Sequence, residues 1–531
     1  MIAPETFSAD ERRRLAPYFT NVDGPVFALR NLPEVVKGAL FARYSRSAKS
    51  LRRLFLDEFL DQVGPGHEIG DVGTRRADKL YERVFDEYGD DSVAQLGGAH
   101  LACEGASNLL TKVLEWGRLM AYLEQSTRYI AYNDRRGERW KYLLPAELEV
   151  TPLRQDYVDC LDRAFATYAQ WIEPLEAHYR AKFPKDPSDS DAVYKRTIRA
   201  KALDTLRGLL PAATQSNVGL FGSGQAYEAL LLRMRIHPLA EVQQYAAHML
   251  AELRQVIPSF LKRVDRPDRG GRWSDYLRST RDATAARAAR LLAGTAPEPR
   301  PEVVLTDSDP DGEVKVVAAA LYAVSNLPDD QLLQIARAMP TEERLAVLRA
   351  YVGERENRRH KPGRAFERTA YRFDVLTDYG AFRDLQRHRL LTLDWQTLSP
   401  RHGYDVADAV AEVGALPEWK RVMHQSAALH DRLCSAGFVH VAPYAVSMAY
   451  RVRFYVEMNA REALHMIELR TSPQGHPSYR RVCQRMHELI AEQAGHRALA
   501  AAMSFADHSA VDLERLHAER SSERRRQSHG G

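Results

Sequence analysis

Two short polar stretches carry the residue types best suited to binding a phosphorylated ligand. The first is Arg387-His388-Arg389, near the end of an amphipathic segment. Two guanidiniums around one imidazole can hold a phosphate bidentately and stack on a planar ring. A basic helix end favoured by the helix dipole would have the same composition. The triplet alone leaves both interpretations open.

The second stretch runs from Glu124 through Gln125 and Ser126 to Arg128 and Tyr129. In an extended conformation Glu124, Ser126 and Arg128 would share one face. A serine hydroxyl beside a guanidinium suits a phosphate, and a carboxylate on the same face suits a ribose or base donor. A polar edge strand or loop with local ion pairs is the alternative.

A third polar segment, from Asn459 to Arg470, is predicted to be helical because Ala, Leu, Glu and Met are good helix formers. Its two end residues would lie about 20° apart in helical phase and roughly 16 Å apart along the axis. Arg461, His465 and Glu468 form a second polar row. A solvated, salt-bridged helix would have the same pattern.

The elements that must position these residues are mainly helical. Apolar residues recur at helical spacing in three segments, and a short strand is predicted near the middle of the chain. The helical segments are 157–168, 242–256 and 373–385, and the strand is 301–306. We therefore expect an α+β fold with helix in excess.

Proline and glycine punctuation predicts the domain boundaries. A Gly-Gly pair and a Pro-rich run indicate a linker at 265–300, with a helix at about 279–292. We expect domains at 1–264 and 301–515, an exposed loop at 184–191 and a disordered polar tail at 516–531.

The two predicted domains resemble each other. The segment 35–42 echoes 316–323, and 229–234 echoes 466–471. Two echoes in the same order, flanking the other motifs, favour an internal duplication over chance similarity.

Composition and motifs exclude several classes of protein. Lys and Arg number 75 against 71 Asp and Glu, and the net charge of +4 does not indicate nucleic-acid binding. The four cysteines have no CxxC spacing, so we expect no zinc site, no disulfide framework and no other metal site. No Gly-x-Ser-x-Gly elbow or Walker loop occurs.

The location of the protein is also predicted from composition. The N-terminus lacks the apolar core of a signal peptide, and no apolar run approaches the roughly 18 residues of a membrane span. We therefore expect a soluble cytoplasmic protein without a membrane partner.

Taken together, the motifs resemble the signature of the flavin-dependent thymidylate synthases. That signature is Arg-His-Arg followed, after a variable stretch, by Asn-Glu-x-Ser-x-Arg. The C-terminal half keeps Arg387, His388 and Arg389 but has Trp395 in place of the Glu and Thr397 in place of the Ser. None of the cysteines has the Pro-Cys-His context of the conventional thymidylate synthases.

The N-terminal half has the complementary part of the signature. It keeps Glu124, Gln125, Ser126 and Arg128, whereas Trp116-Gly117-Arg118 replaces the triplet. Each half therefore resembles the family through a different part of the same motif.

The segment 454–470 is similar to the family's late helix. The resemblance implies that Asn459, Arg461 and His465 contact flavin and that Arg470 contacts the nucleotide. The N-terminal counterpart keeps Arg233 but has Gly222 and Gly224 at the Asn and first Arg positions. Ser92 aligns with a serine on the flavin side of the family site.

Members of this family are homotetramers whose sites lie at subunit interfaces. The division of motifs between the two halves implies a fused pseudo-dimer with one composite site, and two chains would form a pseudo-tetramer. The resemblance implies conversion of dUMP to dTMP with FAD, methylenetetrahydrofolate and NADPH. The implied nucleotide residues are Glu124, Gln125, Ser126, Arg128, Arg387 and Arg470, and the implied flavin residues are Ser92, His388, Arg389, Asn459, Arg461 and His465.

Two further readings stay open. A divergent flavin or nucleotide enzyme with another substrate is consistent with the loss of the signature Ser and Glu, and with Asp384 where the family favours Gln. A non-catalytic scaffold of the same fold is consistent with two degenerate half-signatures.

Overall fold

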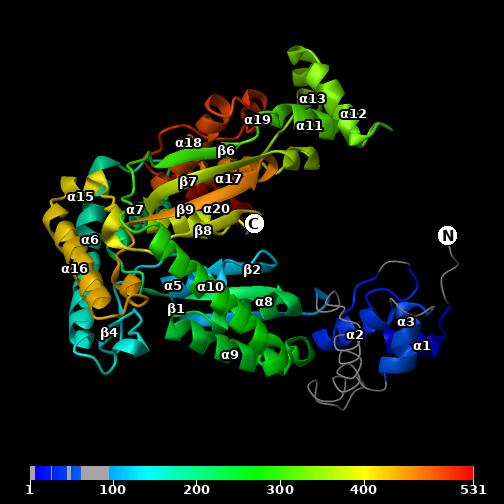
Figure 1. The fold of residues 1–531 in the computed structure, drawn as a ribbon, viewed down its shortest axis with the longest axis horizontal. Helices are drawn as coiled ribbons and strands as arrows, with labels where there is room; N and C mark the ends of the chain where they lie inside the picture. The colour runs from blue at the N-terminus through cyan, green and yellow to red at the C-terminus, as the bar shows by residue number, and fades with distance from the viewer. Residues whose placement is uncertain (1–5, 25–26, 45–48, 61–94, 530–531) are drawn as a thin grey trace. The chain divides into compact units, whose positions relative to one another are not determined.

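A computed structural model describes residues 6–24, 27–44, 49–60 and 95–529 (Figure 1). The chain forms two units. Unit 1 comprises Met1–Ala106, Val113–Glu124 and Ser216–Thr295, and unit 2 comprises Ser107–Lys112, Gln125–Gln215 and Ala296–Gly531. The units therefore differ from the expected division at 265–300, because a long part of the N-terminal half folds with the C-terminal half.

Unit 1 is built around a three-stranded sheet of order β1-β5-β2. Its strands are β1 (Gly98–Ser107), β2 (Met120–Glu124) and β5 (Gln215–Ser223). Its helices are α1 (Ala9–Leu15), α2 (Glu34–Tyr44), α3 (Leu51–Leu54), α8 (Gly224–Arg235), α9 (Ala240–Val256) and α10 (Arg272–Leu291). The expected linker helix is α10, and it belongs to this unit.

Unit 2 contains a four-stranded antiparallel sheet of order β6-β7-β9-β8. The strands are β6 (Val303–Ser308), β7 (Ala370–Asp378), β8 (Thr392–Trp395) and β9 (Arg451–Asn459). The helices are α6 (Leu153–Lys182), α7 (Asp191–Leu206), α11 (Gly312–Tyr322), α12 (Asp329–Ala338), α13 (Thr341–Val352), α14 (Tyr379–Leu385), α15 (Asp408–Glu412), α16 (Leu416–Ser435), α17 (Ala460–Arg470), α18 (Pro477–Glu492), α19 (Arg497–Ala502) and α20 (Leu516–His529). In the described ranges no helix combines the length and apolar composition needed to cross a membrane.

The two sheets repeat one topology, which confirms the tandem duplication. In unit 1, β1 leads through α5 (Asn108–Leu114) to β2, and β5 lies between them and runs into α8. In unit 2, β7 leads through α14 to β8, and β9 lies between them and runs into α17. A helix follows the central strand directly in both, capped by Ser223 in one copy and by Asn459 in the other.

Backbone hydrogen bonds join the two copies inside unit 2. The segment 208–213, from the N-terminal copy, pairs with 444–449 from the C-terminal copy. The Ala212 amide donates to the Val446 carbonyl at 2.8 Å, and the Met448 amide donates to the Leu210 carbonyl at 2.9 Å. Unit 2 is therefore the place where residues of both copies can form one site.

Two elements differ from the sequence expectations. The segment 373–385 was expected to be helical throughout, but its first part is strand β7 and only α14 is helical. Alternate residues Tyr371, Phe373 and Val375 are buried, so the decisive period is two and not 3.6.

The polar tail at 516–531 was expected to be disordered, but α20 forms over most of it. Its charges have partners elsewhere in unit 2. Arg520 donates to Asp189 at 2.8 Å, and Glu519 accepts from Arg196 at 2.8 Å.

Candidate functional site

Four arginines converge on one buried carboxylate in unit 2. Asp384, at the end of α14, is 8% exposed. Arg387 donates to its Oδ1. The Nη1 atom of Arg207 lies 3.6 Å from Oδ2, and Nη1 of Arg470 lies 3.9 Å from Oδ1. With Arg128 close enough to act on the same carboxyl, two arginines come from each copy.

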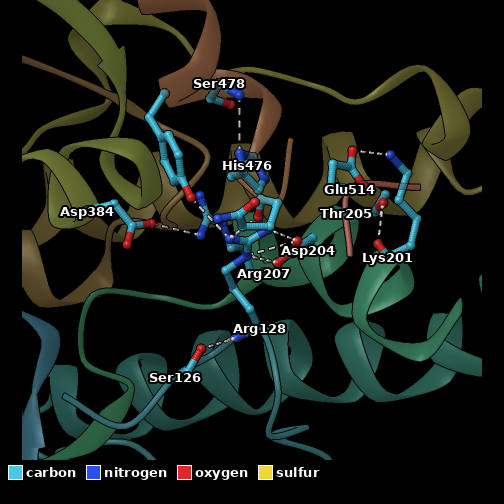
Figure 2. Close-up of polar contacts among 12 residues, drawn as sticks. Ser126, Arg128, Lys201, Asp204, Thr205, Arg207, Asp384, His476, Ser478 and Glu514 are labelled. Atoms are coloured by element: carbon cyan, nitrogen blue, oxygen red, sulfur yellow. Dashed lines mark hydrogen bonds and ion pairs between the residues drawn. The ribbon is translucent and has the colours of Figure 1, made fainter. Parts of the chain in front are cut away.

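Arg128 is held by a second carboxylate, as Figure 2 shows. Its Nε donates to both oxygens of Asp204, at 2.7 and 2.9 Å, and its Nη2 donates to Oδ2 at 2.6 Å. Both side chains are buried. Asp204 lies on α7, so this bidentate pair is internal to the N-terminal copy and fixes the guanidinium plane.

Tyr479 connects the arginines of the two copies. The Nη1 atom of Arg128 donates to the Tyr479 hydroxyl at 3.2 Å and lies 3.4 Å from the Gln474 carbonyl. The guanidinium carbon of Arg470 lies 5.5 Å from the centre of the same ring. Arg128 and Arg470 therefore belong to one polar cluster, although they are far apart in the sequence.

The electrostatics of the cluster favour an anion. Burial alone would raise the pKa of Asp384, but the guanidiniums of Arg387, Arg470, Arg207 and Arg128 hold it well below its usual range. Burial, with Arg207 and Arg128 nearby, lowers the pKa of His476 well below its ordinary value.

A cavity of about 790 Å³ borders this cluster within unit 2. Asp204, Arg207 and His476 line it, together with residues of both copies such as Lys201, Asp378 and Trp419. Its volume is in the range of small-molecule pockets.

A series of hydrogen bonds leads from Arg470, the last residue of α17, through His388 back to Glu462 near the start of the same helix. The Nε of Arg470 donates to His388 Nε2 at 2.9 Å, and His388 Nδ1 lies 3.0 Å from Glu462 Oε1. An arginine Nε can only donate, so His388 Nε2 carries the lone pair and the ring proton lies on Nδ1. Burial lowers the pKa of His388 to about 4, so the ring is neutral.

The other oxygen of Glu462 faces His465, whose Nδ1 lies 3.3 Å from Oε2. Burial would raise the pKa of Glu462, but its hydrogen bonds with His388 and His465 lower it to about 2. Ligand atoms of these three residues lie within 4.8 Å of one another, as in a metal site. The bond from Arg470 requires the proton on His388 Nδ1, which favours a hydrogen-bonded relay over a metal ligand set.

The expected flavin residues lie around α17. Asn459 caps the helix, since its side chain accepts from the Glu462 amide at 2.9 Å. Arg461 donates to the Pro362 carbonyl at 2.9 Å and is partly exposed. Arg389 is exposed, and Ser92 lies outside the described residues.

The segment 124–128 is extended only at its first residue, so Glu124, Ser126 and Arg128 do not share one face of a strand. Glu124 is the last residue of β2 in unit 1, whereas Gln125 begins the next segment of unit 2. A turn follows, in which the Arg128 amide donates to the Ser126 hydroxyl at 3.2 Å. The turn directs Arg128 toward Asp204 through local hydrogen bonding.

The N-terminal copy has not kept the equivalent arrangement. In unit 1, the guanidinium carbon of Arg233 lies 5.2 Å from the centre of the Trp116 ring. Trp116 is the residue that aligns with Arg387. Gly224 replaces Arg461, and a Cβ added there would lie 2.5 Å from Phe260 Cβ. The packing of Phe260 therefore leaves no space for a side chain.

Several residues of the cluster were not identified from the sequence. Asp204, Arg207, Glu462 and Tyr479 lie outside the signature motifs. Arg207 gives one local signal, because it stands alone in the apolar run Leu206-Arg207-Gly208-Leu209-Leu210 and is only 4% exposed. The other three lie in helices, and their partners in the cluster are distant in the sequence.

Residues 40–259 and 303–494 match the family described as thymidylate synthase complementing protein. Proteins named UPF0159 from Chlamydia muridarum and Chlamydia pneumoniae are 39% and 37% identical to the chain; they cover 96% and 97% of it and 97% and 98% of their own lengths. A flavin-dependent thymidylate synthase of Clostridium tetani is 23% identical over 38% of this chain and 75% of its own length.

Among solved structures, the UMP/dUMP methylase PolB from Streptomyces cacaoi, bound with 5-Br dUMP, is 19% identical. The match covers 38% of this chain and 94% of that chain, with a TM-score of 0.29.

Proposed function

Because the chain belongs to the thymidylate synthase complementing protein family, we propose that it is a flavin-dependent enzyme that converts dUMP to dTMP at one composite site in unit 2. The observation that carries the proposal is the convergence of Arg128 and Arg207 from one copy with Arg387 and Arg470 from the other. The C. tetani relative supports the same reaction.

The charge of the cluster suits a nucleotide monophosphate. The four guanidiniums contribute +4, and Asp204 and Asp384 contribute −2, which leaves +2. A phosphate monoester carries nearly −2 at neutral pH, so it would balance the cluster. Arg387 and Arg470 would hold the phosphate by charge-assisted hydrogen bonds. Arg128 would shape the site through Asp204, and Ser126 and Gln125, which precede it, would line the same edge.

The residues at the start of α17 fit a flavin dinucleotide. Burial, together with the like charges of Arg461 and Arg358, lowers the pKa of Lys361, and Arg461 is the second residue of α17. Such a group of cations at a helix N-terminus suits a pyrophosphate. Arg389, Arg461 and His465 would hold the cofactor. The flavin would supply electron transfer from NADPH, with methylenetetrahydrofolate as the carbon donor.

The test is dTMP formation by the purified protein. We expect a yellow preparation that converts dUMP, methylenetetrahydrofolate and NADPH to dTMP, measured by chromatography. Bound flavin without dTMP formation would contradict the proposal and support another substrate. Absence of both flavin and nucleotide binding would support a non-catalytic scaffold.

Substitutions in both copies test the composite site. We expect Arg387→Ala and Arg128→Ala each to weaken dUMP binding at least roughly 10- to 100-fold in calorimetry, since each removes a charged hydrogen bond of the cluster. Arg233→Ala is the matched control, because Arg233 aligns with Arg470 but stacks on Trp116 in unit 1. Intact binding in Arg128→Ala would show that the N-terminal copy does not contribute.

A second candidate is a related enzyme with a different nucleotide substrate. Asp384 favours it, because a carboxylate stands in the cluster where the family favours Gln. A carboxylate accepts hydrogen bonds where an amide can also donate, so a base with an extra donor would be preferred. Competition between dUMP and dCMP would distinguish the two candidates.

We also propose that two chains form a homodimer that corresponds to the family's tetramer. Sedimentation should give a mass twice that of one chain. A monomer that still forms dTMP would contradict this assembly and leave the composite site intact.

A further inference from the structure

Glu462 links two histidines at the base of the arginine cluster. It is 4% exposed, its Oε1 accepts from His388, and its Oε2 lies 3.3 Å from His465. His388 in turn accepts from the Nε of Arg470. Hydrogen bonds therefore connect the carboxylate of Glu462, through His388, to the guanidinium of Arg470 in the proposed phosphate site.

The hydrogen bonds of this chain can form in one direction only. The ionised carboxylate of Glu462 accepts, so it requires a proton on His388 Nδ1. That proton leaves a lone pair on Nε2, which is the acceptor that Arg470 Nε needs. With Nε fixed, Nη1 of Arg470 lies 3.9 Å from Asp384 Oδ1, and the guanidinium carbon lies 5.5 Å from the centre of the Tyr479 ring.

The duplication provides an internal comparison. Counting back from Arg470 to its counterpart Arg233 places Gln225 opposite Glu462, and the triplet alignment places Gly117 opposite His388. The N-terminal copy, in which Arg233 stacks on Trp116, therefore has no counterpart of His388 or Glu462. If the His388–Glu462 pair were needed only for helix packing, both copies would have use for it. Because the pair occurs in one copy, we connect it with the arginine cluster of that copy.

We propose that Glu462 is a positioning residue, which fixes the tautomer of His388 and thereby the orientation of Arg470 toward the phosphate of the substrate. This inference rests on the proposed function of the cluster. Glu462 touches neither the phosphate nor the reacting atoms. Its effect should fall on nucleotide affinity and not on the chemical step.

Kinetics of Glu462→Ala test this role. We expect KM for dUMP to rise at least roughly tenfold, the effect of losing a charged hydrogen bond, with kcat changed little. Glu462→Gln should restore most of the affinity, because its amide oxygen can still accept from His388. A KM within twofold of the wild-type value in Glu462→Ala would overturn the proposal.

Glu468 is a matched control on the same helix. It is 1% exposed and pairs with Arg355 through both oxygens, at 2.6 and 2.7 Å. Glu468→Ala should lower the melting temperature and leave KM unchanged. An equal rise in KM in this variant would show that loss of any buried carboxylate in α17 has the same effect.

A double-mutant cycle tests whether Glu462 acts through His388. In a His388→Asn background, Glu462→Ala should cause no further loss of dUMP affinity. Additive losses would show that the two residues act separately and would overturn the proposal.

The tautomer can be measured without any nucleotide. Nitrogen NMR of histidine-labelled protein, assigned with His388→Asn, should show a protonated Nδ1 and an unprotonated Nε2. The opposite tautomer would overturn the inference even if dUMP binds. Failure of the wild-type protein to bind dUMP would instead contradict the proposed function, while the tautomer still tests the hydrogen-bond chain.

Discussion

The imidazole of His388 is buried between Arg470 and Glu462, and its pKa is lowered from 6.5 to about 4. The pKa of His476 is lowered as well, because that ring is buried near Arg207 and Arg128. In the unfolded chain both rings regain ordinary pKa values and bind protons more readily. The contribution of these two rings to the free energy of unfolding is therefore fully present above about pH 6.5, and it is lost as the pH falls toward 4.

We therefore expect acid to destabilise the folded protein. His388 alone should contribute a loss of roughly 3 kcal/mol between pH 6.5 and 4. Urea unfolding at several pH values measures it. Replacing His388 with Gln should reduce the slope, and an unchanged slope would show that other groups dominate.

The sequence predicted several single residues of the cluster. The signature identified Arg128 and Arg387, and the resemblance to the late helix identified Arg470; all three lie in the cluster of unit 2. It did not identify Asp204, which holds Arg128 and lies 76 residues away in the chain. No local pattern distinguishes a carboxylate that will pair with a distant arginine from one that will face water.

At the scale of elements, the helix predicted at 373–385 shows how a coincidence of spacing misleads. Phe373, Tyr379 and Phe382 have helical spacing, yet Phe373 belongs to a strand. The signal for the strand was the alternation of buried Tyr371, Phe373 and Val375 with polar Arg372 and Asp374. The prediction of a disordered tail was wrong for another reason, since α20 pairs with the distant residues Asp189 and Arg196.

The junction between β5 and α8 carries a prediction about stability. Gly224 packs against Phe260 so closely that a Cβ would lie 2.5 Å from it. Gly224→Ala should destabilise the protein by about 1–3 kcal/mol through overpacking. Thermal unfolding would measure the loss. Gly219→Ala in the adjoining strand β5 is the control, because its Cβ would meet nothing closer than 4.0 Å.

At the scale of the whole molecule, the two sequence copies do not coincide with the two compact units. The segment 208–213 pairs with 444–449, and Gln125–Gln215 belongs to unit 2. The family resemblance predicted that the copies share a site. It could not predict the boundaries of the units, which depend on backbone pairing between distant segments.

Separate expression of the halves tests this organisation. A fragment of residues 296–531 lacks the partner of segment 444–449, so we expect it to aggregate or fail to unfold cooperatively in circular dichroism. Coexpression with residues 1–295 should restore a complex that purifies together. A fragment 296–531 that folds cooperatively alone would contradict the expectation.

The bond from Arg128 to Tyr479 spans 351 positions of the chain. During translation, Arg128 and Asp204 leave the ribosome long before Tyr479 does, at roughly 5–20 residues per second. The nascent chain therefore carries Arg128 and Asp204 for tens of seconds before Tyr479 is added. A premature stop anywhere before Tyr479 would leave the Arg128–Asp204 pair without the hydroxyl that joins it to the C-terminal copy.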